Sequence, residues 1–156
     1  MSASQSASPG PSFQDCNCLA IRQAARHVSQ FYDQLFAPVG LRATQFAILS
    51  RLRRDGPMTI NTLAAALVMD RTTLGRNILP LQRDGLIAIV ASSADRRRRE
   101  LCLSEAGAAK LREADERWRV AQTRFDDVFG SARAATLRGL LREVVASEFA
   151  GAELQG

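Results

Sequence analysis

Apolar residues recur every three or four positions in two long segments near the ends of the chain. The first, residues 15–36, ends before Pro38 and Gly40, and the second begins at Ser104. This spacing puts side chains on one face of a helix, so both segments are predicted to be long amphipathic helices, and residues 132–149 a third helix. The two apolar stripes consist of Cys18, Ile21, Ala25, Val28, Tyr32 and Leu35, and of Leu111, Ala114, Trp118, Ala121, Phe125 and Val128.

Between these segments the pattern changes to shorter elements. Residues 44–52 and 59–67 are predicted helices, and after a tight connection a further helix occupies residues 70–85. The apolar run 86–90 and the alternating segment 100–103 are predicted strands joined by a loop. Two helices joined by a tight turn and followed by a hairpin form a winged helix-turn-helix. The predicted fold class is therefore mainly α with a small β-hairpin wing.

The helix over residues 70–85 has two different faces. Asp70 is a good N-cap, and Leu74, Ile78 and Leu81 would face a core. Arg and Asn side chains can pair with guanine and adenine in the major groove, and a Thr methyl can contact thymine. A solvated polar face would look similar on an isolated helix, but the preceding helix and the following hairpin favour DNA recognition. The candidate base-contacting residues are Arg71, Thr72, Thr73, Arg76 and Asn77.

Composition and charge narrow the class of protein. The 156 residues are 46% hydrophobic, enough for one domain, and the net charge is +5. From Asp70 to Arg99, seven arginines outnumber three aspartates, which favours phosphate as a partner, and Arg51, Arg53 and Arg54 could add contacts. No apolar run could span a bilayer and no signal segment is present, so we expect a cytoplasmic protein. An odd number of cysteines, three, argues against a disulfide framework.

The loop between the predicted strands contains the run Asp95-Arg96-Arg97-Arg98. Together with the closing strand and the long helices on both sides, this loop resembles that of the MarR family of transcriptional regulators, over about residues 15–150. The resemblance implies that Asp95 shapes the wing, that Arg97 enters the minor groove, and that the neighbouring Arg96 and Arg98 attract phosphates. It also implies a DNA-binding regulator, most often a repressor, rather than an enzyme.

The terminal helices exceed what a winged domain needs, and a two-fold dimer interface explains them. We divide the chain into a tail (1–12), an N-terminal dimerisation helix (13–40), the winged DNA-binding segment (41–103) and C-terminal dimerisation helices (104–156), in one globular domain overall. A homodimer presents two recognition helices to half-sites about one turn apart, so the expected partner is double-stranded DNA with a pseudo-palindromic operator. Trp118 is expected in the core.

The cysteines near the first helix are the best candidates for sensing a signal. Cys16 and Cys18 are predicted in its first turn, where the helix dipole and Arg22 would stabilise a thiolate. The spacing of Cys18 from Arg26 and Tyr32 resembles that of the reactive cysteine in the organic-hydroperoxide-sensing branch of the family. That resemblance implies a bond between Cys18 and Tyr32 of the partner subunit, since about 21 Å of helix separates them within one chain. At the position one turn after the cysteine, where that branch has a second tyrosine, this chain has Arg22.

The same region of the chain is also compatible with roles that involve no oxidation. Cys18 could be a small residue of the dimer stripe, or a small aromatic or phenolic effector could bind between the dimer helices and the DNA-binding segment, near Arg22, Arg26 and His27. Two functions other than DNA binding are also compatible with the sequence. The first is an enzyme, a thiol peroxidase that uses Cys18, and the second is an adaptor whose helix-turn-helix binds only proteins. Zinc-ligand spacing is absent, so neither a metal nor a cofactor is expected. Cys102, in the second predicted strand, is expected to face the core.

Overall fold

The computed structural model describes residues 12–149, and its elements follow the predicted order. The predicted tail, except Ser12, lies outside the described residues. Helix and strand boundaries agree with the sequence prediction to within three residues. The elements are η1 (Phe13–Asp15), α1 (Asn17–Phe36), η2 (Ala37–Val39), α2 (Ala43–Asp55), α3 (Ile60–Ala66), α4 (Arg71–Arg83), β1 (Ile87–Ala91), β2 (Arg99–Leu103), α5 (Glu105–Phe129) and α6 (Ser131–Ala146).

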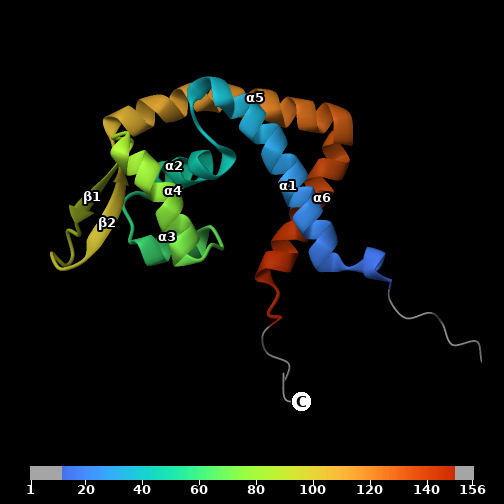
Figure 1. The fold of residues 1–156 in the computed structure, drawn as a ribbon, viewed down its shortest axis with the longest axis horizontal. Helices are drawn as coiled ribbons and strands as arrows, with labels where there is room; N and C mark the ends of the chain where they lie inside the picture. Colours follow the sequence, from blue (N-terminus) through green and yellow to red (C-terminus); the bar gives the residue numbers. More distant parts are fainter. Residues whose placement is uncertain (1–11, 150–156) are drawn as a thin grey trace, which may run out of the picture.

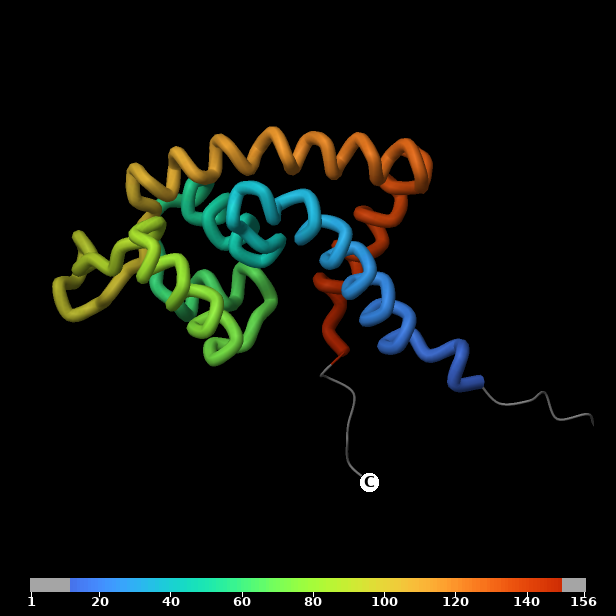
Figure 2. Tube along the Cα trace, turned by 45° about the horizontal axis from the view of Figure 1, so that its top comes forward, coloured from blue at the N-terminus to red at the C-terminus, as the bar shows by residue number. Residues whose placement is uncertain are grey.

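The long helix α5 connects two lobes of the molecule (Figure 1). Below one end of α5 lie α2, α3, α4 and the β-hairpin, which form the DNA-binding lobe. Below the other end lie α1 and α6, and the tube in Figure 2 shows the same separation from a second direction. The mainly helical fold with a hairpin wing is therefore confirmed. No helix within the described residues is both long and apolar enough to cross a membrane.

The core lies in the DNA-binding lobe, where the predicted apolar face of α4 is buried. Leu74, Ile78 and Leu81 are almost completely covered, as the spacing of three and four predicts. They pack against apolar residues from α2, α3, the hairpin and the start of α5. The main contributors are Ile48, Leu49, Leu52, Leu63, Ile87, Leu101 and Leu111.

The hairpin is a two-stranded antiparallel sheet in which Ile87 pairs with Leu103 and Ala91 with Arg99. Because side chains alternate between the faces of a strand, burial of Leu101 against the core places Cys102 on the opposite face. The prediction that Cys102 faces the core is therefore wrong.

A close contact joins the wing to α5. The Ser104 hydroxyl accepts a hydrogen bond from the Gly107 amide at 2.9 Å and donates one to the Gly85 carbonyl at 2.6 Å, which caps α5 as its sequence predicts. A Cβ added at Gly107 would overlap the Leu86 carbonyl oxygen and lie 2.7 Å from Cδ1 of Leu103. Gly107 thus allows α5 to begin directly against the base of the wing.

The terminal lobe leaves much apolar surface uncovered. On α6 only Ala134 is buried, whereas Leu140, Leu141, Val144 and Val145 are exposed. The core position predicted for Trp118 is wrong, because this side chain is 38% exposed and stacks on Phe46, with the ring centroids 6.5 Å apart. Side chains of this kind need a further surface to be buried.

Candidate nucleic-acid interface

The N-terminus of α4 is fixed by its predicted cap. The Asp70 carboxylate accepts a hydrogen bond from the Thr73 amide at 2.8 Å, and the Thr73 side chain and amide together hold the pKa of Asp70 below its usual value. This cap satisfies one of the free amides of the first turn. The start of α4 is therefore fixed by the local hydrogen bond between Asp70 and Thr73.

The polar residues of α4 do not all lie on one side. With about 100° of rotation per residue, Thr72 and Arg76 point nearly opposite the buried Leu74, Ile78 and Leu81, whereas Arg71 lies within about 60° of that core direction. Arg71, Thr72, Thr73 and Arg76 are all exposed. Thr72 and Arg76 therefore form the centre of the outward face, with Thr73 and Arg71 at its two margins.

Asn77 is turned toward its own helix. Its amide Nδ2 donates a hydrogen bond to the Thr73 carbonyl at 2.9 Å, and the side chain is half-buried. To contact adenine, this amide would have to leave its backbone partner. Asn77 is thus less ready to bind DNA than Arg76, a difference that residue type and spacing do not reveal.

The wing turn is held by Asp95. Its carboxylate accepts a hydrogen bond from the Arg97 amide at 2.9 Å, while its carbonyl accepts one from the Arg98 amide at 2.9 Å. Ser92, which is buried, closes the loop because its amide donates to the Arg98 carbonyl, also at 2.9 Å. This turn leaves Arg96, Arg97 and Arg98 exposed at the tip.

Every arginine of α2 has a carboxylate partner, whereas Arg71 and Arg76 of α4 and Arg96 and Arg97 of the wing have none among the described residues. Arg53 forms two hydrogen bonds with Asp115 of α5, at 2.7 and 3.1 Å, which ties the DNA-binding lobe to α5. Arg51 and Arg54 both contact Asp55, and the hydrogen bond from Arg54 lowers the pKa of that carboxyl. The phosphate contacts expected from these arginines would compete with these pairs.

The two N-terminal cysteines occupy different environments. Cys16 precedes α1 as its N-cap, where its Sγ accepts a hydrogen bond from the Leu19 amide at 3.5 Å, so the prediction that it lies within the first turn is wrong. The short helix η1, begun by Ser12, replaces that turn. Cys18 lies in the first turn of α1 and is exposed, as is Arg22 one turn further on, and both cysteines are free thiols.

Tyr32 is already hydrogen-bonded within its own chain. Its hydroxyl donates to Oε1 of Gln122 on α5 at 2.6 Å, and burial, followed by the charge of Asp126, raises its pKa. A hydroxyl has one proton to donate. A bond from Tyr32 to the thiolate of a partner subunit would therefore require Tyr32 to release Gln122.

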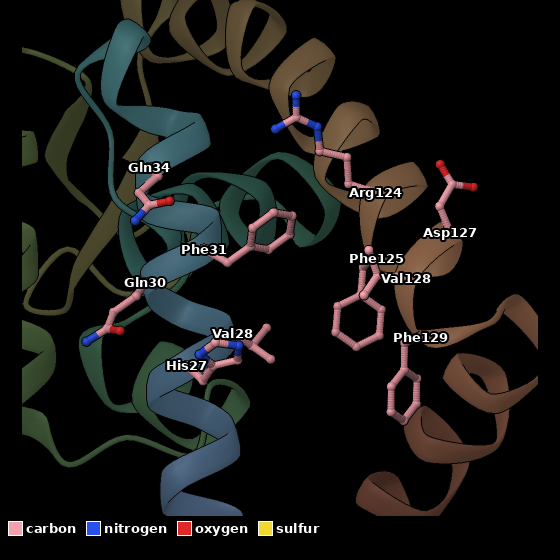
Figure 3. A pocket seen from close by; sticks show the side chains of 10 residues that line it. All are labelled: His27, Val28, Gln30, Phe31, Gln34, Arg124, Phe125, Asp127, Val128 and Phe129. Carbon is pink, nitrogen blue, oxygen red and sulfur yellow. The ribbon is translucent and has the colours of Figure 1, made fainter.

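Two hollows beside α5 are candidate sites for a small-molecule effector. Figure 3 shows the first, a groove of about 700 Å³, with Phe31 of α1 pointing toward Phe125 and Phe129 of α5. His27 lines this groove, whereas Arg22 and Arg26 are exposed on α1 outside it. The second, of about 720 Å³, lies between α2 and α5 and is lined by Phe46, Ser50, Arg51, Arg53, Arg54 and Trp118.

A third groove, of about 310 Å³, lies between α4 and the hairpin, and the sequence pattern did not predict it. We call it the α4–wing groove. The signal for it was present, since Leu79 is an apolar residue outside the buried stripe of α4 and is 65% exposed. Its lining includes Gly75, Ile78, Leu79, Ile89, Arg99 and Leu101.

The fold and these exposed arginines define a winged helix-turn-helix DNA-binding protein. Residues 41–98 match the sequence model of the MarR family. A search of curated proteins returned no match. Solved structures of transcriptional regulators match nearly the whole chain, two of them with more than 30% identity, and the chain belongs to the MarR family of transcriptional regulators. These proteins regulate transcription, so the thiol peroxidase alternative is set aside.

Three solved structures illustrate the similarity. MosR of M. tuberculosis, in complex with DNA, is 34% identical, with 83% of this chain and 98% of that chain covered and a TM-score of 0.68. A probable transcriptional regulator from Pseudomonas aeruginosa is 32% identical, with coverage of 85% and 99% and a TM-score of 0.72. BpsR of Bordetella bronchiseptica, whose DNA binding is regulated by 6-hydroxynicotinic acid, is 22% identical, with coverage of 90% and 100% and a TM-score of 0.80, and supports the fold alone.

Proposed function

We propose that the chain is a homodimeric repressor that binds a pseudo-palindromic operator in double-stranded DNA in the cytoplasm. Residues 13–40 and 104–156 dimerise, and residues 41–103 bind DNA. The proposed DNA-binding residues are Arg71, Thr72, Thr73, Arg76 and Asn77 on α4, with Asp95, Arg96, Arg97 and Arg98 in the wing.

The observation that carries this proposal is that exposed, unpaired arginines lie on both α4 and the adjacent wing. Among residues 12–149, Arg71, Arg76, Arg96 and Arg97 lie more than 4.0 Å from any carboxylate, whereas every arginine of α2 has an acidic partner. Arginines without internal partners on a helix and an adjacent wing match the phosphates and base edges of two neighbouring grooves. Binding should weaken steeply with salt, because neutralised phosphates release counterions.

The uncovered apolar surface of α6 supports a homodimer. Val145 is 65% exposed in the single chain, and a second copy would cover it together with its neighbours. We expect light scattering to give twice the chain mass, and Val145→Asp to give a monomer. Val68→Asp is the matched control, because Val68 is 71% exposed in the turn before α4, outside the terminal helices. A dimer that survives Val145→Asp would contradict the assignment of α6.

Oxidation of Cys18 is the proposed switch. The exposed Cys18 thiolate attacks an organic hydroperoxide, the O–O bond breaks, a sulfenic acid forms, and the alcohol leaves after protonation. Attack by the Cys16 thiol, or by a cysteine thiol of the partner subunit, would then form a disulfide and release water. Because Cys16 Sγ caps α1 through the Leu19 amide, a disulfide that includes Cys16 would remove that cap and alter a dimerisation helix.

The test of the switch compares two serine variants. In reduced protein, Cys18→Ser should leave DNA affinity unchanged and abolish the loss of binding caused by organic hydroperoxide. Cys102→Ser, on the outer face of β2, is the control and should respond as the natural protein does. A peroxide response that persists in Cys18→Ser would refute the redox assignment.

A small aromatic anion is the second candidate effector. The hollow between α2 and α5 places the aromatic rings of Phe46 and Trp118 beside three arginines. Because Asp55 and Asp115 pair with these arginines, an anionic ligand would have to displace a carboxylate. BpsR, which shares the fold, responds to 6-hydroxynicotinic acid. Release of DNA by aromatic carboxylates, with Cys18→Ser responding normally, would favour this effector over peroxide.

A further inference from the structure

The turn between α3 and α4 contains a residue in an unusual backbone conformation. Val68 has a φ of 52°, and in the described part of the chain it is the one residue other than glycine with a positive φ. In this left-handed region the Cβ atom approaches the following carbonyl oxygen, so valine, which branches at Cβ, rarely adopts it. A valine at this position therefore strains the turn that leads into α4.

The hydrogen bonds of this turn explain its shape but not its valine. The Val68 amide donates to the Ala65 carbonyl at 3.2 Å. The next amide, that of Met69, donates to the Ala64 carbonyl at 2.9 Å. This pair of bonds is the Schellman ending of a helix, in which the left-handed residue is usually glycine. Glycine would form the same turn without strain, so the backbone alone does not account for a valine.

The core does not use the Val68 side chain either. Its two neighbours, Leu67 and Met69, are partly buried and pack against the core, whereas Val68 is 71% exposed. Val68 also lies outside the α4–wing groove. Backbone strain costs folding free energy, and a strained residue in a structure often marks a functional contact. Because neither the turn nor the core needs this valine, its apolar surface is available to another molecule.

The α3–α4 turn adjoins the residues that the proposed function assigns to the major groove. Val68 is two residues before the N-cap Asp70 and three before Arg71. In helix-turn-helix proteins the N-terminal residues of the second helix contact base edges. In Figure 1 the α3–α4 turn and the tip of the wing both lie at the lower side of the DNA-binding lobe. The turn is therefore on the side of the lobe that would face DNA.

The chemistry of the major groove indicates which group this valine meets. Its base edges present hydrogen-bond donors and acceptors, together with one prominent apolar group, the 5-methyl of thymine. We propose that Val68 packs against the 5-methyl group of a thymine in each operator half-site, and so reads a base pair by apolar contact. This inference rests on the proposed function, because it requires α4 to lie in the major groove.

The first measurement uses the full chain and a duplex that the protein selects from a random pool. Val68→Asn removes both methyl groups and keeps a residue that tolerates the left-handed conformation. It should not lower the melting temperature, yet it should weaken binding about fourfold for each half-site, as expected for one buried methyl contact. Val68→Gly, which also removes the strain, should lose the same affinity. Val120→Asn makes the same exchange at an exposed position of α5 and should leave DNA affinity unchanged.

Replacement of single thymines in the selected duplex by uracil then locates the contact, because this exchange removes only the 5-methyl group. With the natural protein, uracil at one position of a half-site should weaken binding about fourfold. With Val68→Asn, uracil at that position should cause no further loss, since the partner of the methyl group is already gone.

Two results would overturn the inference alone. The first is unchanged DNA affinity in Val68→Asn and Val68→Gly. The second is a uracil duplex series that loses as much affinity with Val68→Asn as with the natural protein, which would leave Val68 against deoxyribose or against no part of the DNA. Failure of the natural protein to bind any duplex would overturn the proposed function and the inference with it.

Discussion

The junction between the wing and α5 provides the sharpest structural prediction. In Gly107→Ala, the new methyl would overlap the Leu86 carbonyl oxygen and crowd Leu103, and both belong to the base of the wing. Overpacking against a fixed backbone atom costs about 3 kcal/mol, and the better helix propensity of alanine returns about 1 kcal/mol. The net loss should be about 2 kcal/mol, or about 4 to 8 °C in melting temperature for a chain of this size.

Urea denaturation of Gly107→Ala beside Gly75→Ala measures this effect. Gly75 is the matched control, since a Cβ there meets open space within a helix, so its variant should gain about 0.5 to 1 kcal/mol. The two identical substitutions should therefore move stability in opposite directions. Equal stability of the two variants would refute the close approach of α5 to the wing.

Two further predictions concern the DNA-binding lobe. Arg97→Ala should weaken binding to all duplexes and reduce the slope of log affinity against log salt by about 1, if Arg97 contacts a phosphate-lined groove; an unchanged slope would exclude it. Because the pKa of Asp70 is lowered, its contribution to stability is present above the unfolded pKa and is lost as pH falls through the folded pKa. Asp70→Asn, which can still cap α4, should therefore remove part of the acid sensitivity seen by thermal melting, and an identical pH profile would refute this role.

The sequence predicted the elements that depend on local rules. Asp70 and Ser104 cap α4 and α5 because each has a side-chain acceptor three residues before the amide it binds. The buried face of α4 followed from spacing alone, and the hairpin followed from alternation on both sides of a charged loop. Each of these features is determined by residues that lie only a few positions apart in the sequence.

The features that the sequence did not predict depend on distant partners or on local competition. Arg53 finds Asp115 across 62 residues, and Tyr32 finds Gln122 across 90, distances that no periodicity encodes. Asn77 bonds its own helix instead of facing outward. Cys16 lies outside α1 because a short helix with its own cap precedes it. Each of these alters which candidate side chain is free to act.

The central claim is that α4 binds DNA through Arg76. Fluorescence anisotropy tests it most directly, with the natural protein and two arginine variants titrated into two duplexes. One duplex is selected by the protein from a random pool, and the other has the same bases in scrambled order. Arg76→Ala should cost about 1 to 3 kcal/mol on the selected duplex, with a smaller loss on the scrambled one. Arg54→Ala removes the same charge from α2, where Asp55 pairs with it, and should leave both affinities nearly unchanged. Equal losses in the two variants, or binding by the natural protein that ignores salt, would contradict the account.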